Sequence, residues 1–483
     1  MRTFLDTRRA KRSVAFMTLI CLFVNLCVIP PRPSLALTLS EEKELGSKIL
    51  AKIREHVPLV EDGEIFTYLQ SVGNRIVKQL GTTSYQYQFF VVDAAVPNAF
   101  AIPGGYVFVY RGLIEMMKSE GELASILCHE LAHIQARHIH RRIESGKLAS
   151  IAAVAGVLAA VLLGMKAGPS ASQALAMGSV AGAASYQLSY SRENEEEADQ
   201  LGFSYLVAAG YPPQDMVGIM QRMSQEKWRG NSKIPTYLST HPDMNARVEY
   251  LKDLVQKYLG TAKKPAERQS EGDFPIMQAA LVAQYADPRV AQDRFQAKAR
   301  KGDIVAVYGM GRLYLRQGNV TDALPYLQDA ARLDSGSPFV LSTLGTAYYQ
   351  RGKLLEAQKV LKTALLLNPE ASSVHHRLAL VSIELGQNEE ALDHLRQIES
   401  LAYIFLDIDY QLGVVLGRVN QLGPAHYHLG RYYQNKRDFE LAIFHFNKAK
   451  IYFRGSPDKV AEIELVLKEL GEKKKEAFWE SHR

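Results

Sequence analysis

The chain has 483 residues, of which 47% are hydrophobic and 22% charged. This composition is ordinary for a globular protein of two or three domains and excludes a low-complexity or disordered chain. The formal net charge is +6, but residues 1–36 hold six basic residues against one acidic residue. The rest of the chain is therefore nearly neutral, which excludes the basic surface expected of a nucleic-acid-binding protein.

The first 36 residues have the pattern of an export signal. A basic start precedes an apolar run over residues 14–30, and Ser34 and Ala36 then occupy the small-residue positions that signal peptidase prefers. We predict cleavage after Ala36 and export of the mature protein. An uncleaved N-terminal anchor is the open alternative, because the run is near the lower length limit for a membrane span.

One cysteine would remain after that cleavage. Cys21 and Cys27 lie in the apolar run, so Cys128 would stand alone and no internal disulfide is expected. We interpret Cys128 as a small buried apolar residue.

Strand-like runs occur at residues 85–92, 98–102 and 106–110. Pro103, Gly104 and Gly105 supply a turn between the last two runs. The sequence therefore predicts a small sheet ahead of the segment described next.

The segment "SILCHELAHIQARHIH", residues 125–140, contains the pattern H-E-x-x-H. His129 and His133 are four residues apart, so on a helix their rings leave one face at a separation that one zinc ion can bridge. Glu130 would act as general base for a water that the metal acidifies. On a continuing helix His140 would lie about 10 Å beyond His133 and His138 would point elsewhere, so we expect both on a solvated basic helix end.

Two stretches rich in Ala, Gly and Ser follow, at residues 148–163 and 171–186. The first is short for a membrane span, and small residues permit close helix contact. We predict an apolar helical hairpin over residues 148–186 that packs on the catalytic unit or against a lipid surface.

A catalytic zinc needs three protein ligands and one open position. The segment "SRENEEEADQLG" offers carboxylates just before apolar residues at helical spacing, and Glu195 and Asp199 share a helix face. Spacing alone does not choose Glu195 over Glu193 or Glu196 as the third ligand.

Residues 259–275 are polar and charged and are predicted to be a linker. Beyond them, small and apolar residues at positions 344, 345, 348, 352, 357, 361 and 364 recur 34 residues earlier and, less fully, 34 residues later. A fourth copy at 429–449 is displaced by 51 residues from the third, which an extra helix near 404–420 would explain. We also expect a helical pair at 276–300 and a C-terminal capping helix.

These motifs together resemble known proteins. H-E-x-x-H followed by E-x-x-x-D, with "PNAFAIPGGYVFVYRGL" and "THPDMNARVEYL", resembles the gluzincin metallopeptidases related to the CAAX prenyl protease and HtpX. The period of 34 resembles tetratricopeptide repeats, and the whole layout is similar to the β-barrel assembly-enhancing (BepA-type) proteases. The implied fold class is an α+β minigluzincin-like domain, mostly helical with a small sheet, followed by an all-α repeat solenoid. The expected segments are a signal peptide (1–36), a peptidase domain (37–258), a linker (259–275) and a repeat domain (276–483).

The resemblance also implies roles for single residues. Glu195 would be the third zinc ligand, and Asp199 would accept a hydrogen bond from a zinc histidine and orient it. His241 would reach the zinc as a latch that keeps the site inactive. Arg247 would anchor that loop or face the oxyanion, and the sequence does not separate these roles.

The predicted function is that of an endopeptidase with one Zn²⁺ per chain, acting in quality control of outer-membrane proteins. We expect the strand at 98–102 or at 106–110 to present an open edge to an extended substrate, with Asn98, Ala99, Phe100 and Ala101 as substrate-binding residues. The expected partners are unfolded proteins and a protein bound to the repeats, such as the β-barrel assembly machinery. The resemblance also implies that the chain is periplasmic and associates with the outer membrane. Two alternatives stay open: a repeat-based chaperone with a latent protease, and a membrane-embedded peptidase of the HtpX kind.

Overall fold

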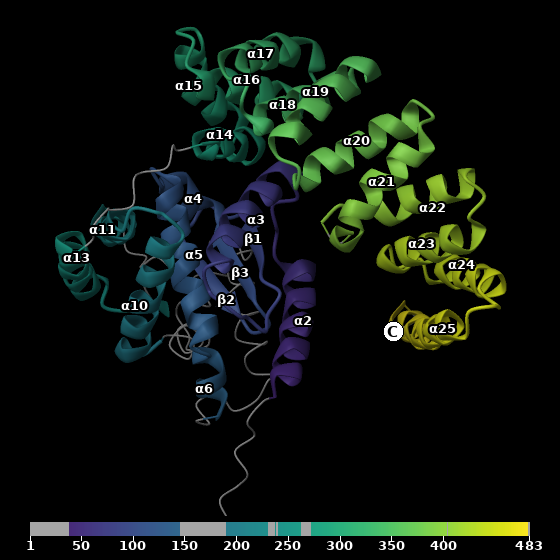
Figure 1. Ribbon diagram of the computed structural model, residues 1–483, viewed down its shortest axis with the longest axis horizontal. Helices are drawn as coiled ribbons and strands as arrows, with labels where there is room; N and C mark the ends of the chain where they lie inside the picture. Colours follow the sequence, from purple (N-terminus) through teal and green to yellow (C-terminus); the bar gives the residue numbers. More distant parts are fainter. Residues whose placement is uncertain are drawn as a thin grey trace, which may run out of the picture.

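The computed structural model describes residues 38–144, 190–229, 237, 240–261, 272–402 and 404–481. Figure 1 shows a mixed unit of helices around a small sheet, and an arc of paired helices that starts at α14 and curves past α3 towards the C-terminus. The predicted fold class is confirmed. The predicted export signal at 1–36 and hairpin at 148–186 lie outside the described residues, and the three boundaries between the four predicted segments stay predictions.

The mixed unit contains a small sheet of β1 (Gln88–Val92), β2 (Ala99–Ile102) and β3 (Tyr106–Tyr110). β3 lies in the centre, parallel to β1 and antiparallel to β2. Gly104 and Gly105 make the turn between β2 and β3 with φ of +90° and +96°, a conformation that glycine adopts without steric cost. The three predicted strands are confirmed, but β3 is not an edge, so of the two strands proposed for an open edge only β2 qualifies.

The helices of this unit surround that sheet. They are α2 (Leu39–His56), α3 (Gly63–Val77), α4 (Arg111–Met116), α5 (Glu120–Gln135), α6 (His138–Glu144), α10 (Arg192–Ala208), α11 (Gln214–Arg229) and α13 (Met244–Thr261). Among the helices that the structure describes, none combines the length and the apolarity needed to cross a bilayer.

Helix α5, which carries the H-E-x-x-H pattern, is the buried centre of the unit. Ser119 caps it by accepting a hydrogen bond from the Glu122 N–H, and acidic residues occupy its first turn, where the helix dipole favours them. α10 packs directly against it, since a Cβ at Gly202 would lie 3.2 Å from backbone atoms of His129. This close approach of two backbones brings the carboxylates of α10 to the histidines of α5.

The repeat array consists of antiparallel helix pairs. They are α14 (Phe274–Tyr285) and α15 (Pro288–Ala299), α16 (Ile304–Arg316) and α17 (Val320–Leu333), α18 (Pro338–Gln350) and α19 (Leu354–Leu367), α20 (Ser372–Glu384) and α21 (Asn388–Ile398), and α23 (Leu422–Asn435) and α24 (Phe439–Tyr452). The predicted extra helix is α22 (Ile408–Arg418), which follows the short 3₁₀ helix η1 (Glu399–Leu401), and the predicted cap is α25 (Pro457–Ser481). The repeat pattern therefore predicted this part of the fold correctly.

The array folds back onto the mixed unit. Arg312 of α16 forms ion pairs with Asp62 and Glu64 at the start of α3, and all three residues are less than 10% exposed. Gln278 of α14 donates hydrogen bonds to the carbonyls of Ile114 and Met117, at 2.7 and 2.8 Å. Buried and partly buried polar contacts thus join the two parts.

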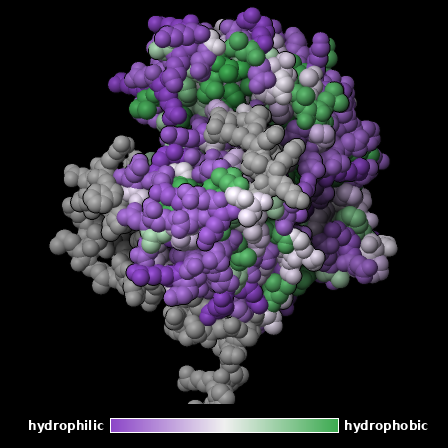
Figure 2. Space-filling view, turned by 60° about the vertical axis from the view of Figure 1, so that its left-hand side comes forward, coloured by the Kyte–Doolittle hydropathy of each residue, from purple (hydrophilic) through white to green (hydrophobic). Residues whose placement is uncertain are grey.

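Hydrophilic residues dominate the face of the molecule in Figure 2, and hydrophobic residues form small, separate patches on it. The large buried cluster of apolar residues runs from α3, the sheet and α5 into the first helices of the array. One continuous apolar cluster therefore joins the mixed unit to the first helices of the array, which adds to the polar contacts between them.

Candidate metal centre

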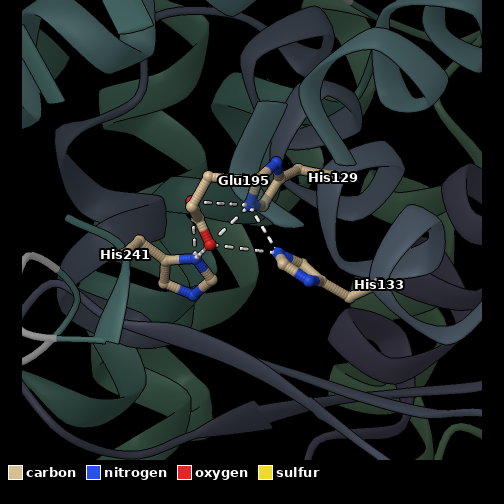
Figure 3. A group of neighbouring side chains, drawn as sticks. All are labelled: His129, His133, Glu195 and His241. Atoms are coloured by element: carbon tan, nitrogen blue, oxygen red, sulfur yellow. Dashed lines mark hydrogen bonds and ion pairs between the residues drawn. The ribbon is translucent and has the colours of Figure 1, made fainter. Parts of the chain in front are cut away.

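Four side chains from three segments converge beside α5. His129 and His133 come from α5, Glu195 from α10 and His241 from the segment before α13, and one ligand atom of each lies within 4.8 Å of the others (Figure 3). The His129 and His133 Nε2 atoms are 3.0 Å apart, and His241 Nδ1 is 2.9 Å from a Glu195 oxygen. All four residues are at most 1% exposed.

This donor set fits zinc. Imidazole nitrogens and a carboxylate oxygen are ligands that Zn²⁺ prefers, and two of them come from one helix at i and i+4. The Nε2 atoms of His129 and His133 face each other at 3.0 Å, so two lone pairs there require a proton or a cation between them. A cation at the centre would satisfy these lone pairs and the carboxylate together.

The geometry also selects among the acidic residues that spacing left open. Glu195 is 1% exposed and faces the histidines, whereas Glu193 and Glu196 on the same helix are exposed to solvent. Of these three carboxylates, the structure therefore brings only Glu195 to the centre.

Glu130 lies next to the centre, and both of its carboxylate oxygens are buried with no hydrogen-bond partner among the residues that the structure describes. One of them is 3.7 Å from His241 Nε2. Burial raises the pKa of Glu130, against the opposing effect of His241 and His129. A carboxylate whose lone pairs are unused and whose proton affinity is increased is suited to accept a proton from a reacting water.

Asp199 and Arg247 lie behind the centre. Asp199 is 2.9 Å from His129 Nδ1, and Arg247 donates to both of its oxygens at 2.7 Å and forms an ion pair with Glu195. Burial opposes ionisation of Asp199, but Arg247 and His129 outweigh it and lower the pKa of that carboxyl. The Arg247 guanidinium thus contacts both carboxylates, and Asp199 lies beside His129. The role of Asp199 in orienting a zinc histidine stays a prediction.

His241 is held by a short segment of chain before α13. Its N–H donates to the Tyr237 carbonyl at 2.8 Å, and the Tyr237 ring stacks on the imidazole with 4.3 Å between centroids. Burial opposes protonation of His241, but the Glu195 and Glu130 carboxylates outweigh it and raise the pKa of the ring. With His241 in this place, none of the four converging residues is accessible to solvent.

Two histidines do not lie where the sequence analysis placed them. His138 and His140 are 0% and 6% exposed, so the expectation of a solvated helix end is wrong. α5 ends at Gln135 and Arg137 has φ of +52°, which turns the chain back. His138 therefore returns to within 2.7 Å of His133. A left-handed arginine carries no signal in the sequence.

Two aromatic rings at the centre were also missed. The Tyr190 ring stacks on His133 at 3.9 Å between centroids, and Tyr237 stacks on His241. Neither has a spacing that connects it to the H-E-x-x-H pattern. By contrast, Cys128 is buried within α5 as predicted, and burial raises the pKa of its thiol.

The predicted substrate residues lie at the start of and along β2. The carbonyl of Asn98 accepts a hydrogen bond from the Tyr110 N–H at 2.9 Å, which fixes this end of β2 to β3. Ala99, Phe100 and Ala101 pair with β3, and within the described parts of the chain no strand pairs with the other edge of β2. Substrate binding at these four residues stays a prediction.

An H-E-x-x-H helix with a facing carboxylate, joined to paired helical repeats, defines a metallopeptidase-type domain followed by a repeat array. Residues 65–255 match the model of peptidase family M48, and residues 280–338, 314–379 and 423–450 match models of the tetratricopeptide repeat. The chain therefore carries an M48 peptidase domain followed by C-terminal tetratricopeptide repeats, as the sequence motifs indicated.

The chain is also similar over much of its length to proteins that are named as proteases. The chain is 31% identical over 317 residues to the putative beta-barrel assembly-enhancing protease of Vibrio cholerae, over 64% of this chain and 63% of that protein. It is 27% identical over 369 residues to the beta-barrel assembly-enhancing protease of Escherichia coli, over 75% and 74%. A shorter match, 31% over 188 residues, covers 38% of this chain and 52% of the mitochondrial metalloendopeptidase OMA1 of Schizosaccharomyces pombe.

Proposed function

We propose that this protein is a zinc-dependent endopeptidase of the cell envelope that acts on misfolded or stalled outer-membrane proteins. The single observation that carries the peptidase assignment is the buried group of His129, His133, Glu195 and His241 beside the unpartnered Glu130 carboxylate. The names of the similar assembly-enhancing proteases support the proposed substrate class and, with the export signal predicted at residues 1–36, the periplasmic location.

His129, His133 and Glu195 would hold the zinc. When bound, the metal would lower the pKa of water and polarise the scissile carbonyl. Glu130 would accept the proton of the attacking water and deliver it to the leaving amine, since its oxygens have no competing hydrogen bond. Asp199 would keep the His129 ring in one orientation through Nδ1, with Arg247 fixing the position of the Asp199 carboxylate.

His241 would keep the resting site closed. Its Nδ1 lies 3.4 Å from His129 Nε2 and 2.9 Å from a Glu195 oxygen, so it would take the position that substrate needs. Displacement of the segment from Tyr237 to His241 would leave a site with three ligands and an open position, as hydrolysis requires.

Extended substrates would add to the free edge of β2. Backbone hydrogen bonds at a strand edge give affinity with little dependence on side chains, which suits a protease that takes unfolded chains. The tetratricopeptide repeats would bind a protein partner, and the names of the relatives point to the β-barrel assembly machinery.

A second candidate function is a repeat-based assembly factor whose protease is silent in the resting state. The complete burial of the four converging residues favours it, because such a centre does no hydrolysis until the His241 segment moves. In that case Glu130→Gln would keep most of the biological role.

Digestion of casein by zinc-loaded protein tests the proposal. We expect slow cleavage by the wild type, fast cleavage by His241→Ala and none by Glu130→Gln. Glu196→Gln serves as a control, because this glutamate lies on α10 next to Glu195 but is exposed. If His241→Ala binds one zinc per chain and still cleaves nothing, the peptidase proposal is wrong and the assembly-factor candidate takes its place.

A further inference from the structure

The metal-centre histidine His133 has a second contact on the side away from the other ligands. Figure 3 shows its second ring nitrogen directed away from Glu195 and His241. That nitrogen, Nδ1, is 2.7 Å from Nδ1 of His138, whose ring is completely buried. The other nitrogen of His138, Nε2, is 3.1 Å from a carboxylate oxygen of Glu197 on α10.

The protons in this chain have one consistent arrangement. His133 must keep a lone pair on Nε2 to bind a metal, so its proton is on Nδ1. This N–H can be donated only if His138 Nδ1 accepts, which places the His138 proton on Nε2. That N–H in turn points to Glu197, which also receives a hydrogen bond from Arg141 at 3.0 Å. Each donor thus meets an acceptor.

The two zinc histidines would then be supported in parallel ways. His129 contacts the Asp199 carboxylate directly, at 2.9 Å. His133 has no carboxylate at its Nδ1 and reaches Glu197 through the imidazole of His138. Glu197 and the proposed ligand Glu195 lie on the same helix, so α10 would supply both a ligand and an orienting group.

The backbone is arranged to make this contact. The left-handed conformation of Arg137 reverses the chain between α5 and α6 and brings His138 back under His133. A non-glycine residue with positive φ costs free energy, so the surrounding contacts must hold it in place. Tyr190 stacks on His133 and covers one face of the ring, whereas His138 contacts its Nδ1 edge.

We propose that His138 and Glu197 are positioning residues that fix the tautomer and ring orientation of His133 for metal binding. This inference rests on the proposed function, since it assumes that His133 is a zinc ligand. Groups that orient a metal-binding histidine typically change metal affinity or activity 10- to 100-fold when they are removed.

Zinc affinity of the full chain, measured by competition with a chromophoric chelator, tests the proposal without any substrate. His138→Leu should weaken zinc binding about 10- to 100-fold. His138→Asn should recover most of this loss, because the Asn oxygen can accept the His133 proton. His140→Leu is the matched control, since His140 is also buried on α6 and its Nδ1 accepts from Arg137 at 3.0 Å. Unchanged affinity in His138→Leu would overturn the inference.

A second pair of variants covers the case in which His138→Leu fails to fold, as judged by thermal unfolding without metal. Glu197 is 43% exposed at its side chain, so Glu197→Ala should fold normally. We expect it to weaken zinc binding several-fold relative to Glu196→Ala. Equal affinities of these two variants would overturn the role of Glu197. A wild-type chain that binds no zinc would refute the proposed function together with this inference, whereas tight wild-type binding with unaffected variants would refute this inference alone.

Discussion

Substitution of Arg312 tests whether a buried ion cluster holds the repeat array and the peptidase domain together. Its guanidinium lies between Asp62 and Glu64, with 2.5 Å to the nearer Glu64 oxygen. Arg312→Met keeps most of the side-chain volume and removes the charge. Two carboxylates would then remain at the interface, each less than 10% exposed.

The loss of stability in Arg312→Met depends on the hydrogen bonds that the two carboxylates retain. Asp62 still caps α3 through the N–H groups of Glu64 and Ile65, at 3.0 and 3.1 Å, and Glu64 still accepts from Ser342 at 2.8 Å. Removing one partner of a buried ion pair usually costs about 3–5 kcal/mol, because the remaining charge is uncompensated. The remaining hydrogen bonds place the expected loss near the lower end, about 3 kcal/mol.

Native-state hydrogen exchange of the α3 amides measures this loss, because it reports the free energy of local opening. A loss of about 3 kcal/mol corresponds to exchange more than about 100-fold faster. Arg437→Met is the control: Arg437 also pairs with the peptidase domain, at 3.0 Å from Glu55, but its side chain is 74% exposed. An exposed pair is worth less than about 1 kcal/mol. If Arg437→Met speeds exchange as much as Arg312→Met does, burial does not make the Arg312 cluster stronger than an exposed pair.

Two further predictions concern the metal and the repeats. Zinc at about 1,000 times its Kd should add about 4 kcal/mol to the free energy of unfolding of the wild type. The thermal midpoint should therefore rise with zinc and fall again when a chelator is added. Glu195→Gln should lose most of this shift and Glu196→Gln none of it, as scanning calorimetry with and without zinc would show. Gly345→Ala should destabilise the array by about 1–3 kcal/mol in urea unfolding, because the new Cβ would lie 2.5 Å from a side-chain atom of α19. Gly417→Ala in α22 meets no atom within 4 Å, so it should be neutral or stabilising, and a loss equal to that of Gly345→Ala would contradict the packing argument.

The parts that the sequence predicted well are those in which local pattern and tertiary role coincide. A period of 34 residues records helix pairs that pack mainly on their neighbours, so the array and the extra helix α22 followed from spacing. The strands were predicted from composition, but their order was not, since β3 becomes central only through pairing with β1. The exposure of His138 was predicted wrongly because we expected α5 to continue beyond Gln135. The positive φ of Arg137, which turns the chain back, is visible only in the structure.

The converging residues differ in how firmly each is held, and this difference bears on how the centre opens. α5 and α10 are in backbone contact at Gly202, and Arg247 joins Asp199 to Glu195 by charged hydrogen bonds and ion pairs. His241 is held by a backbone hydrogen bond to the Tyr237 carbonyl, by a ring stack with Tyr237 and by a contact of 2.9 Å with Glu195. Moving α10 would separate Glu195 and Asp199 from Arg247 and break the backbone contact with α5, which is costly. Moving His241 breaks its contact with Glu195, but Arg247 still compensates that carboxylate. The cheaper movement therefore removes His241 and leaves His129, His133 and Glu195 in place, which is the ligand set that hydrolysis needs.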